Sequence, residues 1–94
     1  MARNTKKIDG KVLAEYRKSA KLSQLDLAVI LGRSREWVSA IENNEEPSIV
    51  VISLDLIQQW MNVCHRRIAA YGQLERAETL KSSILSSILN IFIK

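Results

Sequence analysis

The sequence is poor both in residues that break helices and in residues that build reactive sites. Only 1 Pro and 3 Gly occur among 94 residues, which favours helices over short strands joined by turns. The single cysteine, Cys64, excludes an internal disulfide framework and suits a reducing cytoplasm. Cys64 and His65 are adjacent, so their side chains diverge on a helix, and neither a metal-ligand spacing nor a glycine-rich phosphate loop is present. We therefore expect no enzyme, no metal site and no cofactor.

A long apolar run is also missing. The first eleven residues are polar and basic, so no signal peptide is visible. The most apolar stretch, residues 84–93, is shorter than the ~18 residues of a membrane span and is interrupted by Ser86, Ser87 and Asn90. These features predict a soluble, cytoplasmic protein of one small domain, with no membrane partner.

Charge is present but unevenly distributed. The net charge is +4. Residues 1–21 carry seven Lys or Arg against two acidic residues, residues 22–47 carry two against five, and residues 48–94 carry five against three. Positive charge is therefore concentrated at the N-terminal end, an arrangement that suits attraction to a polyanion such as DNA.

Apolar residues recur at helical spacing, which predicts an all-α fold. Ser23 and Ser34 are good N-caps, and Asp26 stands close to a capping-box position behind Ser23. Gly32 and Gly72 are plausible helix ends. The β-branched run at residues 49–52 is interpreted as a loop. The expected helices cover about residues 10–20, 24–31, 35–42, 54–71 and 75–92.

Two short helices joined by a tight turn containing glycine have the geometry of a helix-turn-helix. The run SQLDLAVILGRSREWVSAIEN resembles the Cro/repressor-type helix-turn-helix of the XRE family of transcriptional regulators. The positions that match the family pattern are Ser23, Gln24, Leu27, Ala28, Leu31, Gly32, Ser34, Val38, Ser39, Ile41, Glu42 and Asn43. The resemblance covers about residues 10–63, and the segment 53–57 is also similar to the fourth helix of restriction–modification controller proteins.

The resemblance implies a lambda-repressor-like bundle of about five helices with a C-terminal helical extension. Its parts would be a flexible basic arm at residues 1–9, a helix-turn-helix domain at 10–63 and a helical extension at 64–94. The implied function is that of a phage-type or controller-type regulator, a repressor that binds a palindromic operator in double-stranded DNA as a homodimer. The family also places a partly buried ion pair at Arg17 and Glu42.

The third helix is expected to carry the base contacts, because its N-terminal end enters the major groove in this motif. The outward residues there are Arg35, Glu36, Ser39 and Ala40. An arginine fork suits guanine O6 and N7, a glutamate suits cytosine N4, and Ala40 offers only contact with a thymine methyl group or a close approach. The alternative for Arg35 and Glu36 is a solvated ion pair.

Contacts to the DNA backbone are expected around both ends of this unit and from the N-terminal arm. The residues assigned to the backbone are Ser23, Gln24, Arg33, Ser34, Trp37, Asn43 and Asn44. Trp37 either packs on the sugar-phosphate wall or covers the core. Arg3, Lys6 and Lys7 either reach around the duplex or form an untethered solubilising tail.

The last helix carries an apolar stripe whose surface is larger than a 94-residue monomer easily buries. Its residues are Leu80, Ile84, Leu85, Ile88, Leu89, Ile91 and Phe92. The stripe is interpreted as a homodimer interface, with folding back onto the first and fourth helices or a groove for another protein as the alternatives. The second candidate function is a protein-binding regulator, similar to an antirepressor or antitoxin, that keeps the helix-turn-helix as a scaffold and binds its partner through the apolar C-terminal helix.

Overall fold

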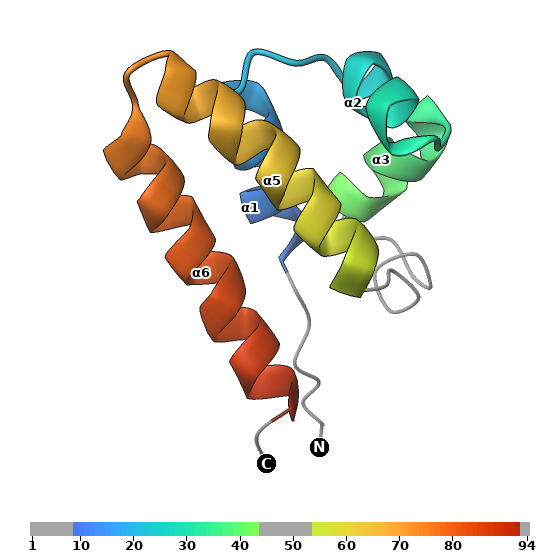
Figure 1. Cartoon of the computed structure of the whole chain (residues 1–94). Coiled ribbons are helices and arrows are strands. Elements are labelled where there is room, and N and C mark those ends of the chain that lie inside the picture. The colour runs from blue at the N-terminus through green and yellow to red at the C-terminus, as the bar shows by residue number, and fades with distance from the viewer. Residues whose placement is uncertain (1–8, 44–53, 93–94) are drawn as a thin grey trace.

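The computed structural model describes residues 9–43 and 54–92, except for the side chains of a few residues in the last two helices. The described residues form five helices and no strand, which confirms the all-α fold. The helices are α1 (Gly10–Ser19), α2 (Gln24–Leu31), α3 (Arg35–Glu42), α5 (Leu54–Ala70) and α6 (Leu74–Phe92). In Figure 1, α5 and α6 form an antiparallel hairpin, α1 lies behind α5, and α2 and α3 pack together at one side. None of the described helices is long and apolar enough to cross a membrane.

Polar side chains cap the three short helices. The Asp9 carboxylate accepts a hydrogen bond from the backbone N–H of Lys11 at 2.9 Å, so Asp9 is the N-cap of α1. Asp9, the last residue of the predicted arm at residues 1–9, thus satisfies a donor that the first turn of α1 leaves unpaired. Ser23 and Asp26 form a complete capping box at α2, with distances of 2.9 and 3.1 Å.

The turn between α2 and α3 depends on one glycine. Gly32 has a φ of +70°, in the left-handed region that side chains with a Cβ disfavour. The N–H of the next residue, Arg33, then returns to the carbonyl of Ala28 at 2.8 Å and closes the end of α2. Ser34 follows at once as the N-cap of α3 and accepts from the N–H of Trp37 at 3.0 Å. The two helices are thus joined by three residues.

Two large polar-tipped side chains hold α1 to the hairpin. Trp60 and Tyr16 are the largest fully buried side chains among the described residues. The Trp60 indole N–H donates to the carbonyl of Leu13 at 3.0 Å, and the Tyr16 hydroxyl donates to the carbonyl of Ala77 at 3.2 Å. Both polar atoms are paired inside the core, so α1, α5 and α6 are fixed against one another without an unsatisfied donor.

Part of the C-terminal stripe folds back into the same core. Leu80 and Ile84 are buried against the rest of the chain, because residues four apart on a helix share one face. They are not available to a second copy in this structure, which corrects their assignment to a dimer interface. Leu85 and Leu89, one and five positions after Ile84, are 44% and 56% exposed. The side chains of Ile88, Ile91 and Phe92 lie outside the described residues. The predicted domain boundary at residue 64 falls inside α5.

Cys64 is fully buried in this core, and burial raises the pKa of its thiol from 9.0 to about 12. We expect a thiol reagent at about pH 8 to label the native protein only through unfolding, because the thiolate is the nucleophile.

The free energy of unfolding should also fall as the pH rises from about 9 to about 12, since the unfolded thiol ionises first. Labelling rates with and without concentrated urea measure the first effect, and equal rates would contradict it.

Candidate nucleic-acid interface

The α2–α3 unit is held together by an apolar wedge that leaves one side of α3 outward. The buried residues of the wedge are Leu27, Ala28, Leu31, Val38 and Ile41. On the outer side of α3, Arg35 and Glu36 are exposed, and Ser39 and Ala40 are half-buried. The structure therefore brings together the four residues predicted to contact bases, with the two charged side chains extending furthest into solvent.

A buried ion pair joins α1 to the end of α3. Arg17 and Glu42 meet through two hydrogen bonds, Nε to Oε2 at 2.6 Å and Nη2 to Oε1 at 3.0 Å. Their side chains are only 11% and 6% exposed. In a third hydrogen bond, Arg17 Nη1 donates to the carbonyl of Leu22 at 2.8 Å, which ties the turn between α1 and α2 to the ion pair. This bidentate geometry fixes the position of α3 relative to α1.

Gln24 extends this pair to the surface. Its Nε2 donates to Glu42 Oε1 at 3.0 Å, and its Oε1 accepts from Arg35 Nη1 at 3.3 Å. A carboxylate only accepts and a guanidinium only donates, so these neighbours determine the orientation of the amide. We call Arg17, Glu42, Gln24 and Arg35 the polar chain. Gln24 thus links Arg35 to the ion pair, while Nε2 has a second N–H, so the assignment of Gln24 to a phosphate stays a prediction.

The contact between Arg35 and Glu36 is much weaker than the polar chain. Arg35 Nη2 lies 4.0 Å from Glu36 Oε2, and the two side chains are 54% and 80% exposed. An exposed pair of this kind contributes about 0–1 kcal/mol. Either side chain can therefore exchange this contact for another partner at little cost, and both the solvated ion pair and the base contacts stay predictions.

The residues predicted to contact the DNA backbone have different environments. The Ser23 and Ser34 hydroxyls accept capping hydrogen bonds. The Ser34 proton is left to donate elsewhere, whereas the Ser23 hydroxyl also bonds to the Asp26 carboxylate. Arg33 is exposed in the turn, and Asn43 is exposed at the C-cap of α3, where its Nδ2 donates to Ser39 Oγ at 3.3 Å. Asn44, Arg3, Lys6 and Lys7 lie outside the described residues.

Asp26 sets a limit on phosphate binding at the start of α2. The backbone hydrogen bond from Ser23, followed by the bond with its hydroxyl, lowers the pKa of Asp26, which therefore stays ionised. Its negative charge already occupies the end of the helix where the dipole favours an anion. The assignment of Ser23 to a phosphate stays a prediction, and Asp26 weakens it.

Trp37 covers the core rather than lying free at the surface. It is half-buried, and its ring centroid lies 6.2 Å from that of Trp60 in a tilted arrangement. The Arg33 guanidinium sits 5.7 Å from the centroid of the Trp37 ring. Trp37 thus supports Arg33 by a cation–π contact, and the assignment of Arg33 to a phosphate stays a prediction.

The outer face of α2 is apolar. Leu25, Val29 and Ile30 are 56%, 70% and 49% exposed, and the first two are one helical turn apart. We call these three residues the α2 patch. Exposed apolar side chains that lie together on one helix face are typical of a surface that meets another macromolecule.

Sequence reasoning named all four residues of the polar chain, but it did not predict that Gln24 joins Glu42 to Arg35. No spacing along the chain brings residue 24 next to residues 35 and 42, so only the fold reveals the link. Among the described residues, no group of His, Cys, Asp and Glu is placed to hold a metal ion. Comparisons of the chain with protein-family models, curated proteins and solved structures give no match.

Proposed function

We propose that the protein is a sequence-specific DNA-binding regulator of transcription, a repressor of the XRE helix-turn-helix type that acts as a homodimer on a palindromic operator. The observation that carries the proposal is the polar chain. It holds Arg35 at the outward end of α3 through Gln24 and anchors that contact on a buried ion pair. A side chain held in place before binding loses less conformational entropy when it meets its partner.

In this proposal the outer side of α3 lies in the major groove. Arg35 has five N–H donors, and its bond to Gln24 uses one of them. Two of the others can donate together to O6 and N7 of one guanine. Glu36 accepts from a cytosine N4, and the small side chains of Ser39 and Ala40 let the helix approach the bases closely. Arg33, supported by Trp37, contacts a phosphate and sets the register of the helix.

Selection of the purified protein on randomised duplex DNA at ~150 mM salt tests the proposal directly. Enrichment of a palindrome is the expected result, and the spacing of its half-sites reports the dimer geometry. Absence of enrichment by a protein shown to be folded would overturn the proposal.

The α2 patch favours the second candidate function, in which the protein regulates by binding another protein. Salt separates the two candidates. A DNA binder that makes about 6–10 phosphate contacts loses roughly 10³–10⁵ in affinity between 50 and 200 mM salt. An apolar contact through the α2 patch would change little over that range, and substitution of Val29 by Asp would abolish it.

The homodimer is tested at the exposed part of the apolar stripe. The double variant Leu85→Asp with Leu89→Asp should be folded and monomeric, because it places charge on two exposed apolar positions of α6. Ile84 is fully buried, so a charge there would test folding instead. The matched control is Thr79→Asp with Ser86→Asp, which adds the same charge at exposed polar positions of α6. Sedimentation at several concentrations gives the mass, and an unchanged dimer in the leucine variant would place the interface elsewhere.

A further inference from the structure

Lys21, in the turn between α1 and α2, has a backbone conformation that residues with a side chain disfavour. Its φ is +61°, and it is the one residue other than glycine with a positive φ in the described part of the chain. It directly follows the C-cap of α1, a position where glycine is common because it has no Cβ. A lysine here therefore costs backbone strain that a glycine would avoid, and such strain points to a role for the side chain.

The end of α5 holds the Lys21 side chain in place. Lys21 Nζ lies 4.5 Å from the centroid of the Tyr71 ring, which is a cation–π contact. Arg67 supports this ring, because its Nη2 donates to the Tyr71 hydroxyl at 3.4 Å. Arg67 Nε also donates to the carbonyl of Ala20, the C-cap of α1, at 3.2 Å. The ammonium group is thus positioned before any ligand binds, which lowers the entropy that binding costs.

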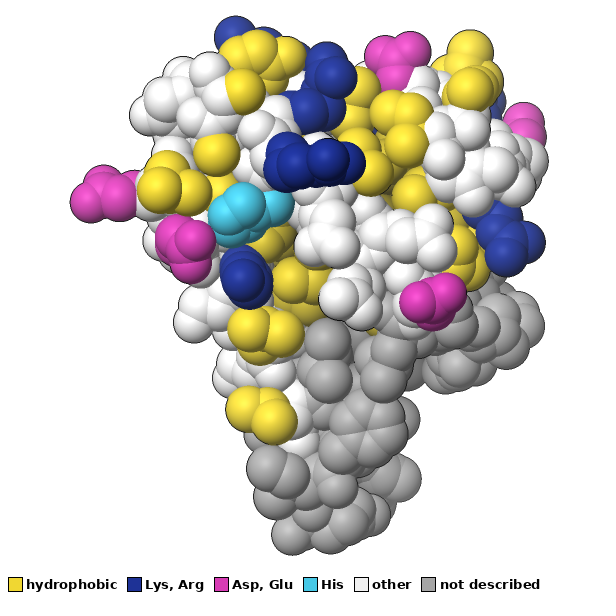
Figure 2. Space-filling view, in the orientation of Figure 1, with side chains coloured by type: hydrophobic (Ala, Val, Ile, Leu, Met, Phe, Trp, Pro, Cys, Tyr) yellow, Lys and Arg dark blue, Asp and Glu magenta, His cyan; other side chains and the backbone are white. Residues whose placement is uncertain are grey.

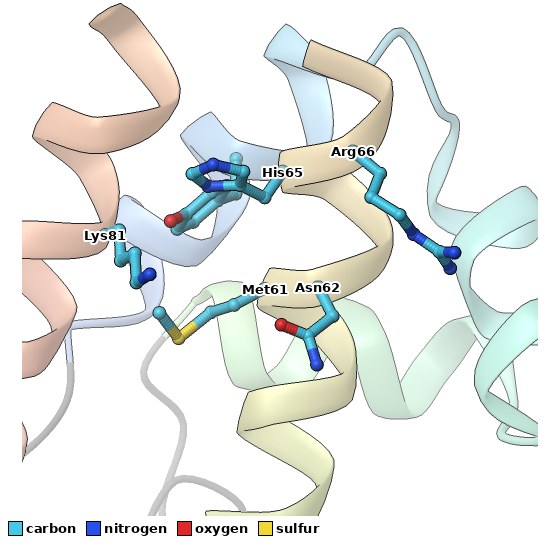
Figure 3. Close-up of a pocket in the computed structure, with 6 residues that line it drawn as sticks. Met61, Asn62, His65, Arg66 and Lys81 are labelled. Atoms are coloured by element: carbon cyan, nitrogen blue, oxygen red, sulfur yellow. The ribbon is translucent and has the colours of Figure 1, made fainter. Parts of the chain in front are cut away.

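Positive charge gathers at this end of the molecule. Lys21, Arg66 and Arg67 are exposed, and none of the ion pairs between described residues includes them. We call these three residues the basic cluster. Figure 2 shows Lys and Arg side chains running from the top of the molecule down the middle of this face. In Figure 3, Arg66 extends away from His65 and Lys81, to the other side of α5. Cations without a carboxylate partner can bind an external anion.

The basic cluster lies beside the start of α2, where Asp26 limits phosphate binding. Lys21 precedes Gln24 by three residues, so the Cα atoms of the two residues are at most about 11 Å apart. After the two hydrogen bonds with Ser23, the positive charge of Arg67 is a further cause of the lowered pKa of Asp26, so these charges are close enough to interact. The three positive charges outweigh the one negative charge, and this end of α2 can attract a phosphate.

We propose that Lys21 binds a phosphate of the DNA strand that passes the start of α2, outside the contacts of the α2–α3 unit. Tyr71 and Arg67 are positioning residues, because they hold the ammonium group through the ring and the turn. The inference rests on the proposed function. Gln24 connects this end of α2 to Arg35, so the strand that flanks the bases read by Arg35 comes within reach of Lys21.

Lys21→Gly tests the proposal, because it removes the charge and relieves the strain together. Affinity of the full-length variant for the palindrome enriched by the unaltered protein should fall about tenfold at ~150 mM salt. The slope of affinity against salt should lessen by about one contact in each half-site. The midpoint of thermal unfolding should not fall, since glycine suits the left-handed backbone. Lys21→Arg keeps the charge and should retain both affinity and slope. Fluorescence anisotropy titrations at several salt concentrations measure these effects.

Lys81→Gln is the matched control for net charge, because it removes one positive charge from an exposed position on α6. It should leave the salt slope almost unchanged. A slope for Lys21→Gly equal to that of the unaltered protein would overturn the inference and leave the proposed function standing, since the operator is still bound. A lowered midpoint of unfolding with that unchanged slope would give Lys21 a structural role alone. An unaltered protein that is folded and enriches no operator would overturn both proposals.

Discussion

Glu42→Ala is expected to lower the free energy of unfolding by about 3–5 kcal/mol, a large part of the stability of a domain this small. The substitution leaves the Arg17 guanidinium buried without its carboxylate, and Arg17 is only 11% exposed. It also removes the acceptor of Gln24. Urea denaturation at constant ionic strength measures the loss.

Two further variants show whether the ion pair is the cause. Arg17→Met with Glu42→Leu removes both charges and keeps apolar volume, so it should recover much of the lost stability. Glu36→Ala removes an acidic side chain from the exposed face of the same helix and should change stability by less than about 0.5 kcal/mol. A double variant as unstable as Glu42→Ala would mean that the cavity, and not the unpaired charge, carries the effect.

The same double variant separates folding from recognition. It should fold, yet Gln24 loses the carboxylate that orients its amide, and Arg35 loses the support of the polar chain. If the DNA-binding proposal is right, discrimination between operator and random DNA should weaken while the fold is kept. Unchanged discrimination in this variant would show that Arg35 recognises DNA without the link through Gln24 to the ion pair.

The sequence predicted the features that depend on near neighbours. Ser23, Ser34 and Gly32 act within three or four residues of their own positions, so their spacing was enough to place both helix caps and the turn. Gly72 likewise ends α5, with a φ of +79°. The N-cap role of Asp9 was not predicted, because Asp9 stands at the end of the basic N-terminal segment and was assigned to it.

Features that depend on which element packs against a given helix face could not be predicted in the same way. The periodicity of Leu80 and Ile84 shows that one side of α6 is apolar, but only the packing of α6 on α1 and α5 shows what covers it. The link through Gln24 has the same origin, because its two partners are 11 and 18 residues away in the chain. Local pattern locates a surface, and tertiary contacts determine its neighbour.

Arg35→Ala is expected to remove base discrimination worth about 1–3 kcal/mol in each half-site, or about 2–6 kcal/mol on a palindrome bound by a dimer. The loss should be confined to the position that Arg35 contacts, with random DNA bound about as tightly as before. The fold should be intact, because Arg35 is exposed and touches the core only through Gln24. Binding to a panel of operators with single substitutions measures the effect.

Arg33→Ala is the matched control, because it removes the same side chain from an exposed position two residues earlier. If Arg33 meets a phosphate, its loss weakens binding to all sequences alike and reduces the slope of affinity against salt by about one contact in each half-site. The two arginines then give opposite signatures, one in specificity and the other in salt dependence. Intact discrimination in Arg35→Ala, with the operator still bound, would remove Arg35 from the base contacts and with it the function proposed for the polar chain.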